Sequence, residues 1–255
     1  MEHHESLFPH ILIGTIFYLF GLKWCSEYAK FWMLSYKRDY EDDSQKSKSL
    51  SRTCQQLFMD HPIEGCLKLL ATAIGLIGTV MGDLSDTEVV SPKVIHATIY
   101  LFFAFSGLVD VLTFYFPKNI PIGLANLALA QSFFIEGFLF VWASPQSNVA
   151  NQIFAGIVWT TSIGVALELV WPELKLLRGF TTILQGGWIT HMVRVNQINI
   201  LTPERIALAF TWHIAGAFGV TLCIVAITRC FMPKNDQPPE VPVYDYCLDQ
   251  PSHVV

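Results

Sequence analysis

Ionisable side chains interrupt several long apolar stretches of this chain, and they are the residues that could do chemistry. The stretch from Val94 to Phe116 carries His96 near one end and Asp110 near the other. On a helix these two residues share a face with Tyr100 and lie about 21 Å apart at ~1.5 Å per residue. Because lipid tolerates neither charge well, this face must look into a bundle in which other helices supply the partners.

Counting from the ends of the apolar stretches places one group of polar residues toward the outer side of a membrane. This candidate outer cluster consists of His96, Glu136, Gln185, Trp188, His191 and His213. Imidazole and carboxylate groups suit zinc or another transition metal, and His96, Glu136 and His213 are the candidate metal ligands. However, no HExxH or HxxxH spacing fixes such a site. A hydrogen-bonded network that joins helices, or a path for protons or a ligand, explains the same residues, so we predict no cofactor and keep the metal as an alternative.

A second group lies toward the inner side and is richer in carboxylates. This candidate inner cluster consists of Glu64, Lys68, Asp110 and Glu168. Asp110 and Glu168 cannot both remain charged and unpaired in a dry interior, and Lys68 is placed to neutralise one of them. The cluster could hold a cation, relay protons or form a salt bridge at the depth of the lipid head groups.

The elements that must position these residues are seven apolar stretches, each near the ~20 residues that a spanning helix requires. They cover residues 7–24, 62–82, 94–116, 121–142, 149–171, 174–195 and 204–232. With 52% hydrophobic and 15% charged residues, the 255-residue chain is too apolar for an ordinary soluble domain. The predicted fold is an all-α, polytopic membrane protein built as a seven-transmembrane-helix bundle over residues 1–232.

Lysine and arginine predict the orientation of the bundle. The segment from Lys23 to Asp60 contains seven of them, which marks it as cytoplasmic and places the N-terminus outside and the C-terminus inside. Residues 37–58 are charged and serine-rich, so we expect a mobile cytoplasmic loop there. Residues 233–255 are proline-rich and predict a disordered cytoplasmic tail that could bind a partner.

Other partners follow from the same composition. The lipid bilayer is the expected surrounding, and no basic tract with interleaved aromatics indicates nucleic acid. Gly75, Gly78 and Gly82 give one helix a small-residue face, which permits close packing within the bundle or between copies of the chain. Gly186 and Gly187 could bend the sixth helix or let a ligand approach its backbone.

Several short segments, in order along the chain, resemble the transmembrane protein 45 family, whose shared region has no assigned function. They are Phe17-Tyr-Leu-Phe-Gly-Leu-Lys-Trp-Cys25, His96-Ala-Thr-Ile-Tyr100 with Asp110, Glu136-Gly-Phe-Leu-Phe140, Ala166-Leu-Glu168, Leu184-Gln-Gly-Gly-Trp188 and Trp212-His213. The resemblance implies a multipass protein of the plasma membrane or of Golgi and endosomal membranes. It implies no reaction and no catalytic residues.

Three functions fit the sequence. Because no catalytic constellation is complete, the first is a non-enzymatic membrane protein that acts in trafficking, assembly or signalling. The second is a small-molecule, lipid or proton pathway through the two polar clusters. The third is a metal-dependent membrane hydrolase, in which a bound ion would activate water.

Overall fold

The structure is a computed structural model that describes residues 7–41, 62–81, 91–121, 123–143, 149–197 and 202–231. All the regular elements in these ranges are helices, and each is longer than a dozen residues. They are α1 (Leu7–Glu41), α3 (Ile63–Met81), α4 (Pro92–Tyr115), α5 (Leu124–Trp142), α6 (Val149–Leu167), α7 (Leu174–Gln197) and α8 (Pro203–Phe231).

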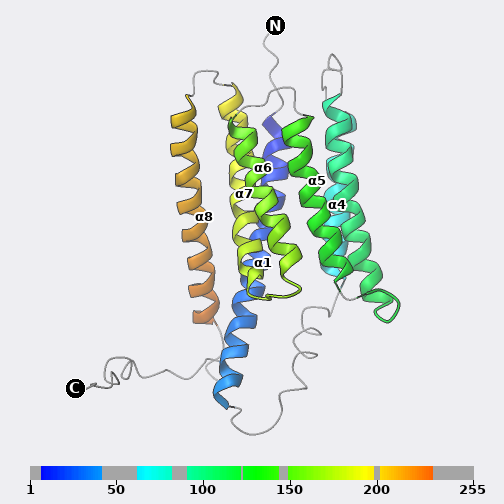
Figure 1. Cartoon of the computed structure of the whole chain (residues 1–255), viewed down its shortest axis with the longest axis vertical. Helices are drawn as coiled ribbons and strands as arrows, with labels where there is room; N and C mark the ends of the chain where they lie inside the picture. The colour runs from blue at the N-terminus through cyan, green and yellow to red at the C-terminus, as the bar shows by residue number, and fades with distance from the viewer. Residues whose placement is uncertain are drawn as a thin grey trace, which may run out of the picture.

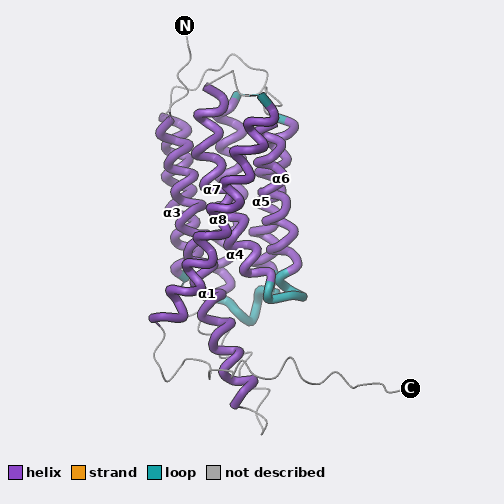
Figure 2. Tube along the Cα trace, turned by 90° about the vertical axis from the view of Figure 1, so that its left-hand side faces the viewer, coloured by secondary structure: helices purple, strands orange, loops and turns teal. Residues whose placement is uncertain are grey.

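The helices run side by side along the long axis of the molecule (Figure 1, Figure 2). Helices α1 and α7 form the most extensive contact and lie in the middle of the bundle (Figure 1). Helix α6 packs on α7, α5 on α6, α4 on α5 and α3 on α4, while α8 rests against α1 and α7. Helices α1 and α3 contact each other at only a few residues.

Five helices, α3, α4, α5, α6 and α8, are long and apolar enough to cross a membrane. Helices α1 and α7 carry more polar residues, among them Lys23, Glu27, Arg178 and Gln185. Because these two helices pack on each other and are flanked by the others, their polar side chains can be sheltered from lipid. The chain is therefore a helical integral membrane protein.

The distribution of side chains over the bundle supports this conclusion. Large apolar side chains stand exposed on the outside, such as Leu70 and Ile77 on α3 and Trp212 on α8. Polar side chains are buried inside, including Glu136 on α5 and Gln185 on α7. A water-soluble domain places its polar groups in the opposite way, so this arrangement suits a hydrocarbon surrounding.

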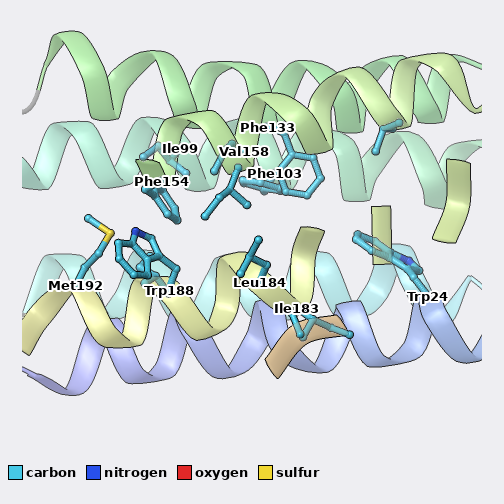
Figure 3. Close-up of a cluster of buried hydrophobic side chains, with 14 of the residues drawn as sticks. Trp24, Ile99, Phe103, Phe133, Phe154, Val158, Ile183, Leu184, Trp188 and Met192 are labelled. Carbon is cyan, nitrogen blue, oxygen red and sulfur yellow. The ribbon is translucent and has the colours of Figure 1, made fainter. Parts of the chain in front are cut away.

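Aromatic rings fill the centre of the bundle (Figure 3). Phe103 of α4 meets Phe133 of α5 edge to face, with 5.2 Å between ring centroids, and Phe17 of α1 lies 5.7 Å from Phe103. Trp188 and Trp24 lie at opposite ends of this cluster (Figure 3). These contacts join α1, α4 and α5 around one core.

Glycines allow α1 and α7 to approach closely. A Cβ atom added at Gly186 would lie 2.6 Å from the backbone nitrogen of Tyr18, and one added at Gly21 would lie 2.6 Å from that of Ile183. Close backbone approach between small residues is a common way to pack membrane helices. The sequence interpretation of Gly186 and Gly187 as a bend or a ligand contact stays a prediction, and the structure adds that Gly186 makes room for α1.

Hydroxyl groups bridge the helices in the same interior. Ser132 of α5 donates a hydrogen bond to the backbone oxygen of Phe102 on α4 at 2.9 Å. Ser162 of α6 donates one to the backbone oxygen of Ala130 on α5 at 2.7 Å. Such bonds contribute about 0.6 kcal/mol each in membranes, so they tie α4, α5 and α6 into one unit.

The helix ends differ from the predicted spans for identifiable reasons. Helix α1 continues past the expected end at Trp24 to Glu41, and its residues Ala29 and Met33 are buried, so hydropathy alone underestimates its length. Helix α4 begins at Pro92 because Ser91 caps it by accepting a hydrogen bond from the Lys93 nitrogen. Helix α5 begins at Leu124 because Gly123 takes a left-handed conformation with φ 96°.

Two further expectations concern segments that the structure covers only in part. Of the expected loop at residues 37–58, residues 37–41 are the last turn of α1 and the others lie outside the described residues, as does the tail at 233–255. Gly75 packs inside the bundle against the Tyr100 ring, whereas Gly78 faces open space. Gly82 also lies outside the described residues. The predicted small-residue face is thus divided between an internal and an external position.

Candidate functional site

Three of the four residues of the candidate inner cluster form one ion-pair group. Lys68 Nζ lies 2.6 Å from Asp110 Oδ2 and 3.2 Å from Glu64 Oε1. The Lys68 side chain is only 6% exposed, so its charge depends on these carboxylates rather than on water. The salt bridge between α3 and α4 that the sequence allows is therefore present.

Helix α1 completes the group with residues that the sequence reasoning did not assign to it. Lys23 Nζ binds Glu64 Oε2 at 2.8 Å and Glu27 Oε1 at 2.7 Å. Trp24 donates a hydrogen bond from Nε1 to Glu64 Oε1 at 3.1 Å. The sequence interpretation counted Lys23 among the cytoplasmic lysines and ended the first apolar stretch at residue 24. The four-residue spacing of Lys23 and Glu27 was the available signal for a helical ion pair.

Glu168, the fourth residue of the candidate inner cluster, binds a different cation. Arg178 Nη1 of α7 lies 3.1 Å from Glu168 Oε2, just beyond the end of α6. The Arg178 guanidinium also covers the Trp24 ring, 4.4 Å from its centroid, while Lys68 Nζ lies 6.0 Å from it. Both cations therefore lie over the Trp24 ring, an arrangement that the attraction of cations to aromatic faces favours.

These residues form a single band of charge across the bundle, which we call the ion layer. It consists of Lys23, Glu27, Glu64, Lys68, Asp110, Glu168 and Arg178. Glu64, Asp110 and Arg178 lie within one or two turns of the helix ends at residues 63, 115 and 174, or roughly 2–8 Å along the axes. The ion layer thus crosses one end of the bundle rather than its middle.

The candidate outer cluster is not one site, because the structure divides it into three separate contacts. Glu136 of α5 accepts a hydrogen bond from Gln185 Nε2 of α7 at 3.0 Å, and both side chains are buried. Gln185 Oε1 is buried without a hydrogen-bond partner. His96 lies close to His10 of α1, near enough for their charges to interact.

The third contact joins α7 to α8 through aromatic rings. The Trp188 ring stacks on His191 at 5.6 Å and meets His213 edge to face at 5.4 Å, and the two imidazoles are 5.0 Å apart between centroids. Trp188 Nε1 donates to the backbone oxygen of Ala150 at 3.2 Å. The ring contacts of this group come from α7 and α8, whereas His96 lies on α4 and Glu136 on α5. Over the described residues no three His, Cys, Asp or Glu side chains are placed to hold a metal ion.

Two cavities meet at Trp24. The first, which we call the apolar cavity, has a volume of about 60 Å³ between α1, α3, α4 and α5. Its walls include Phe17, Phe20, Ala71, Tyr100 and Phe133, and Trp24 and Lys68 also border it.

The second cavity, which we call the polar cavity, has a volume of about 100 Å³. It is lined by Trp24, Glu27, Tyr28, Glu64, Lys175 and Arg178. Trp24 borders both cavities, so its indole separates a space lined by hydrocarbon from a space lined by charge.

In a comparison with models of known protein families, none matches this chain. The groups available for binding or chemistry are those of the ion layer and of the two cavities.

Proposed function

We propose that this chain is a seven-span membrane protein of the transmembrane protein 45 type that binds a lipid-like small molecule and catalyses no reaction. Two further proposals come with this one. All seven helices cross the membrane, with the N-terminus outside and the C-terminus inside, and the compartment is the plasma membrane or Golgi and endosomal membranes. The excess of lysine and arginine between Lys23 and Asp60 supports the orientation.

Tags at the two ends of the full chain test the orientation. In sealed microsomes, whose outer face is the cytoplasmic one, an N-terminal epitope should be protected from added protease, whereas a C-terminal epitope should be digested. If both epitopes behave alike, the number of spans is even and the proposed topology is wrong.

The observation that carries the ligand proposal is the apolar cavity beside the ion layer. An apolar cavity stays dry and takes apolar molecules, since water finds no hydrogen-bond partners in it. At about 60 Å³ the cavity holds only a few methylene groups of a hydrocarbon chain, but it suits them better than a wire of water molecules, and this favours a lipid over a proton as the occupant. Lys68 and Trp24 at the border supply the polar contacts that a lipid-like ligand needs at one end.

A photoreactive alkyl probe tests this function on the purified full chain in detergent. Ala71 lines the apolar cavity, whereas Ala73, on the same helix, is exposed. Ala71→Phe should block labelling of cavity peptides by filling the space, and Ala73→Phe should leave the labelling unchanged. Equal labelling of the cavity peptides in both variants would refute a ligand site at this position.

A role in assembly is a second candidate function, supported by small residues that are exposed on the outside of the bundle. Gly78 on α3 and Gly216 on α8 face open space, next to exposed apolar side chains of the same helices. Close packing of a second copy against one of these faces would suit a protein of trafficking or signalling membranes. Cross-linking between single cysteines placed at these positions should capture a dimer; a monomer at every protein concentration would contradict this role.

A further inference from the structure

The polar cavity carries the strongest further inference, because its walls bring cations, carboxylates and aromatic rings into one space. Lys175 and Arg178 come from the first turns of α7, Glu27 and Tyr28 from α1, and Glu64 from α3. Lys175 and Tyr28 belong neither to the two candidate clusters nor to the ion layer. The question is which ligand this combination of groups fits.

Arg178 favours an anionic part of the ligand. Its Nη1 atom binds Glu168, but its buried Nε atom has no hydrogen-bond partner. The edge of a guanidinium is well suited to two oxygens of a phosphate group, and a buried N–H without a partner favours such an acceptor. Lys175 lines the same cavity and adds a second positive charge, so an anionic phosphate oxygen fits this side.

The carboxylates of the cavity favour a cationic part of the ligand. Glu64 already accepts from Lys23, Trp24 and Lys68, whereas Glu27 lies 2.7 Å from Lys23 Nζ and keeps 32% of its side chain exposed. The ring of Tyr28 lies in the same lining. A carboxylate beside an aromatic ring attracts an ammonium group.

The charges of this lining sum to zero, two positive and two negative. A ligand with only a phosphate would be repelled by Glu27 and Glu64, and one with only an ammonium would be repelled by Lys175 and Arg178. A head group that carries both charges matches both sides. Electrostatic complementarity of this kind determines which ligand is selected.

We propose that the polar cavity binds the zwitterionic head group of a phospholipid, with the phosphate at Arg178 and Lys175 and the ammonium at Glu27 and Tyr28. This inference rests on the proposed function, since part of the alkyl chain of the same lipid enters the apolar cavity, which Trp24 also lines. Residues 64 to 72 of α3 run from one cavity to the other, about 12 Å at ~1.5 Å per residue. The link between head group and chain therefore passes the edge of the Trp24 indole.

The depth of the polar cavity agrees with this ligand. Its residues Glu64 and Arg178 lie one or two helical turns from the helix ends, and so does the ion layer. Lipid head groups occupy the polar regions just outside the ~30 Å hydrocarbon core. A phospholipid of the adjacent leaflet can therefore place its head group here without crossing the bilayer.

Competition against the photoreactive alkyl probe tests the head group on the purified full chain. Three competitors share a palmitoyl chain: lysophosphatidylcholine is zwitterionic, lysophosphatidylglycerol is anionic and monopalmitoylglycerol is neutral. We expect lysophosphatidylcholine to compete at about tenfold lower concentration than either of the others, the factor expected for one charge-assisted hydrogen bond. In this assay the head group is the only variable.

Charge-changing variants then assign the preference to the cavity. Glu27→Gln makes the lining net positive and should shift the preference about tenfold toward lysophosphatidylglycerol. Lys175→Gln makes it net negative and should weaken both phospholipids while monopalmitoylglycerol is unaffected. Lys30→Gln is the matched control, because Lys30 is exposed on α1 outside the cavity lining and should change nothing.

The outcomes separate this inference from the proposed function. If the three competitors act equally on the wild-type chain, the head-group site is wrong while the alkyl site remains. If Glu27→Gln and Lys175→Gln behave like Lys30→Gln, the polar cavity is not the place of recognition. If Ala71→Phe fails to reduce labelling by the alkyl probe, the proposed function itself fails.

Discussion

Replacing Lys68 by methionine tests whether the ion layer holds the bundle together. Methionine has a similar length and no charge, so Lys68→Met removes the 2.6 Å partner of Asp110 and the 3.2 Å partner of Glu64. Glu64 keeps Lys23 at 2.8 Å, but the Asp110 side chain is 18% exposed and loses the cation at 2.6 Å, its ion-pair partner within the described part of the chain. Nearly all of the expected loss therefore comes from Asp110.

The magnitude follows from the cost of leaving one charge of a buried pair alone, which is about 3–5 kcal/mol. Because Asp110 retains some exposure, we expect the lower end, a loss of about 3 kcal/mol in the free energy of unfolding. Lys68→Met combined with Asp110→Asn removes both charges and should restore about 2 kcal/mol of that loss, since an apolar and a neutral group replace the pair.

Equilibrium unfolding of the purified chain in mixed micelles, with increasing fractions of a denaturing detergent, measures these free energies. Lys118→Met is the control, because Lys118 is exposed in the turn after α4 and should change stability by no more than about 0.5 kcal/mol. The reasoning is refuted if Lys68→Met behaves like the control. It is also refuted if the double variant loses as much stability as the sum of the two single ones.

Three other expectations follow from the same structure. Gly186→Ala forces α1 and α7 apart and should cost about 1–3 kcal/mol by the same unfolding assay, whereas Gly216→Ala meets open space and should gain up to about 1 kcal/mol from helix propensity. Glu136→Leu leaves the Gln185 amide without its acceptor and should cost about 1–3 kcal/mol, whereas Glu136→Gln keeps an acceptor and should retain most of the stability. Elemental analysis of the purified chain should find far less than one zinc or iron per molecule, because among the described residues no third His, Cys, Asp or Glu side chain joins His213 and His191; a stoichiometric metal removed by His213→Ala would contradict this.

The fold class was predictable because the length of each apolar stretch can be read directly from the sequence. A span of ~20 apolar residues can satisfy its backbone hydrogen bonds in lipid only as a helix, so the seven stretches predicted seven helices. The predicted ends lie within a few residues of those observed, except at α1. Helix α1 was underestimated because residues 25–41 are largely polar, and a hydropathy count ends the span at the first charged residues. The helix nevertheless continues, with Ala29 and Met33 buried.

The candidate inner cluster was predictable in part for a related reason. Glu64 and Lys68 are four residues apart on one helix, and Asp110 faces inward with Tyr100, so their meeting required only that α3 and α4 be neighbours. Arg178 and Trp24 could not be assigned to it, because arginines and tryptophans near span ends also serve as ordinary membrane-boundary residues. Their role depends on the packing of α1 on α7, which the sequence does not state.

The candidate outer cluster divides because depth along a helix axis does not determine direction around it. Glu136, Gln185 and His213 were assigned by depth to one layer, but Glu136 and Gln185 form a hydrogen bond with each other, whereas the His213 ring meets Trp188. Only a contact between two helices can decide whether residues at one depth meet. Here the contact of α5 with α7 selects Glu136 and Gln185, and the contact of α7 with α8 selects Trp188, His191 and His213.

A ligand site also explains why the bundle retains two costly features next to each other. By the slope of about 24 cal/mol per Å³ for cavities, an empty space of about 60 Å³ costs about 1.4 kcal/mol. Replacing buried ion pairs such as Lys68 and Asp110 with apolar residues is often neutral or stabilising, so stability alone does not require them. Features that weaken a fold and adjoin one another are expected at functional sites. A lipid that filled the apolar cavity and met the charges around Trp24 would recover both costs at once, so binding should raise the stability of the wild-type chain but not that of Ala71→Phe.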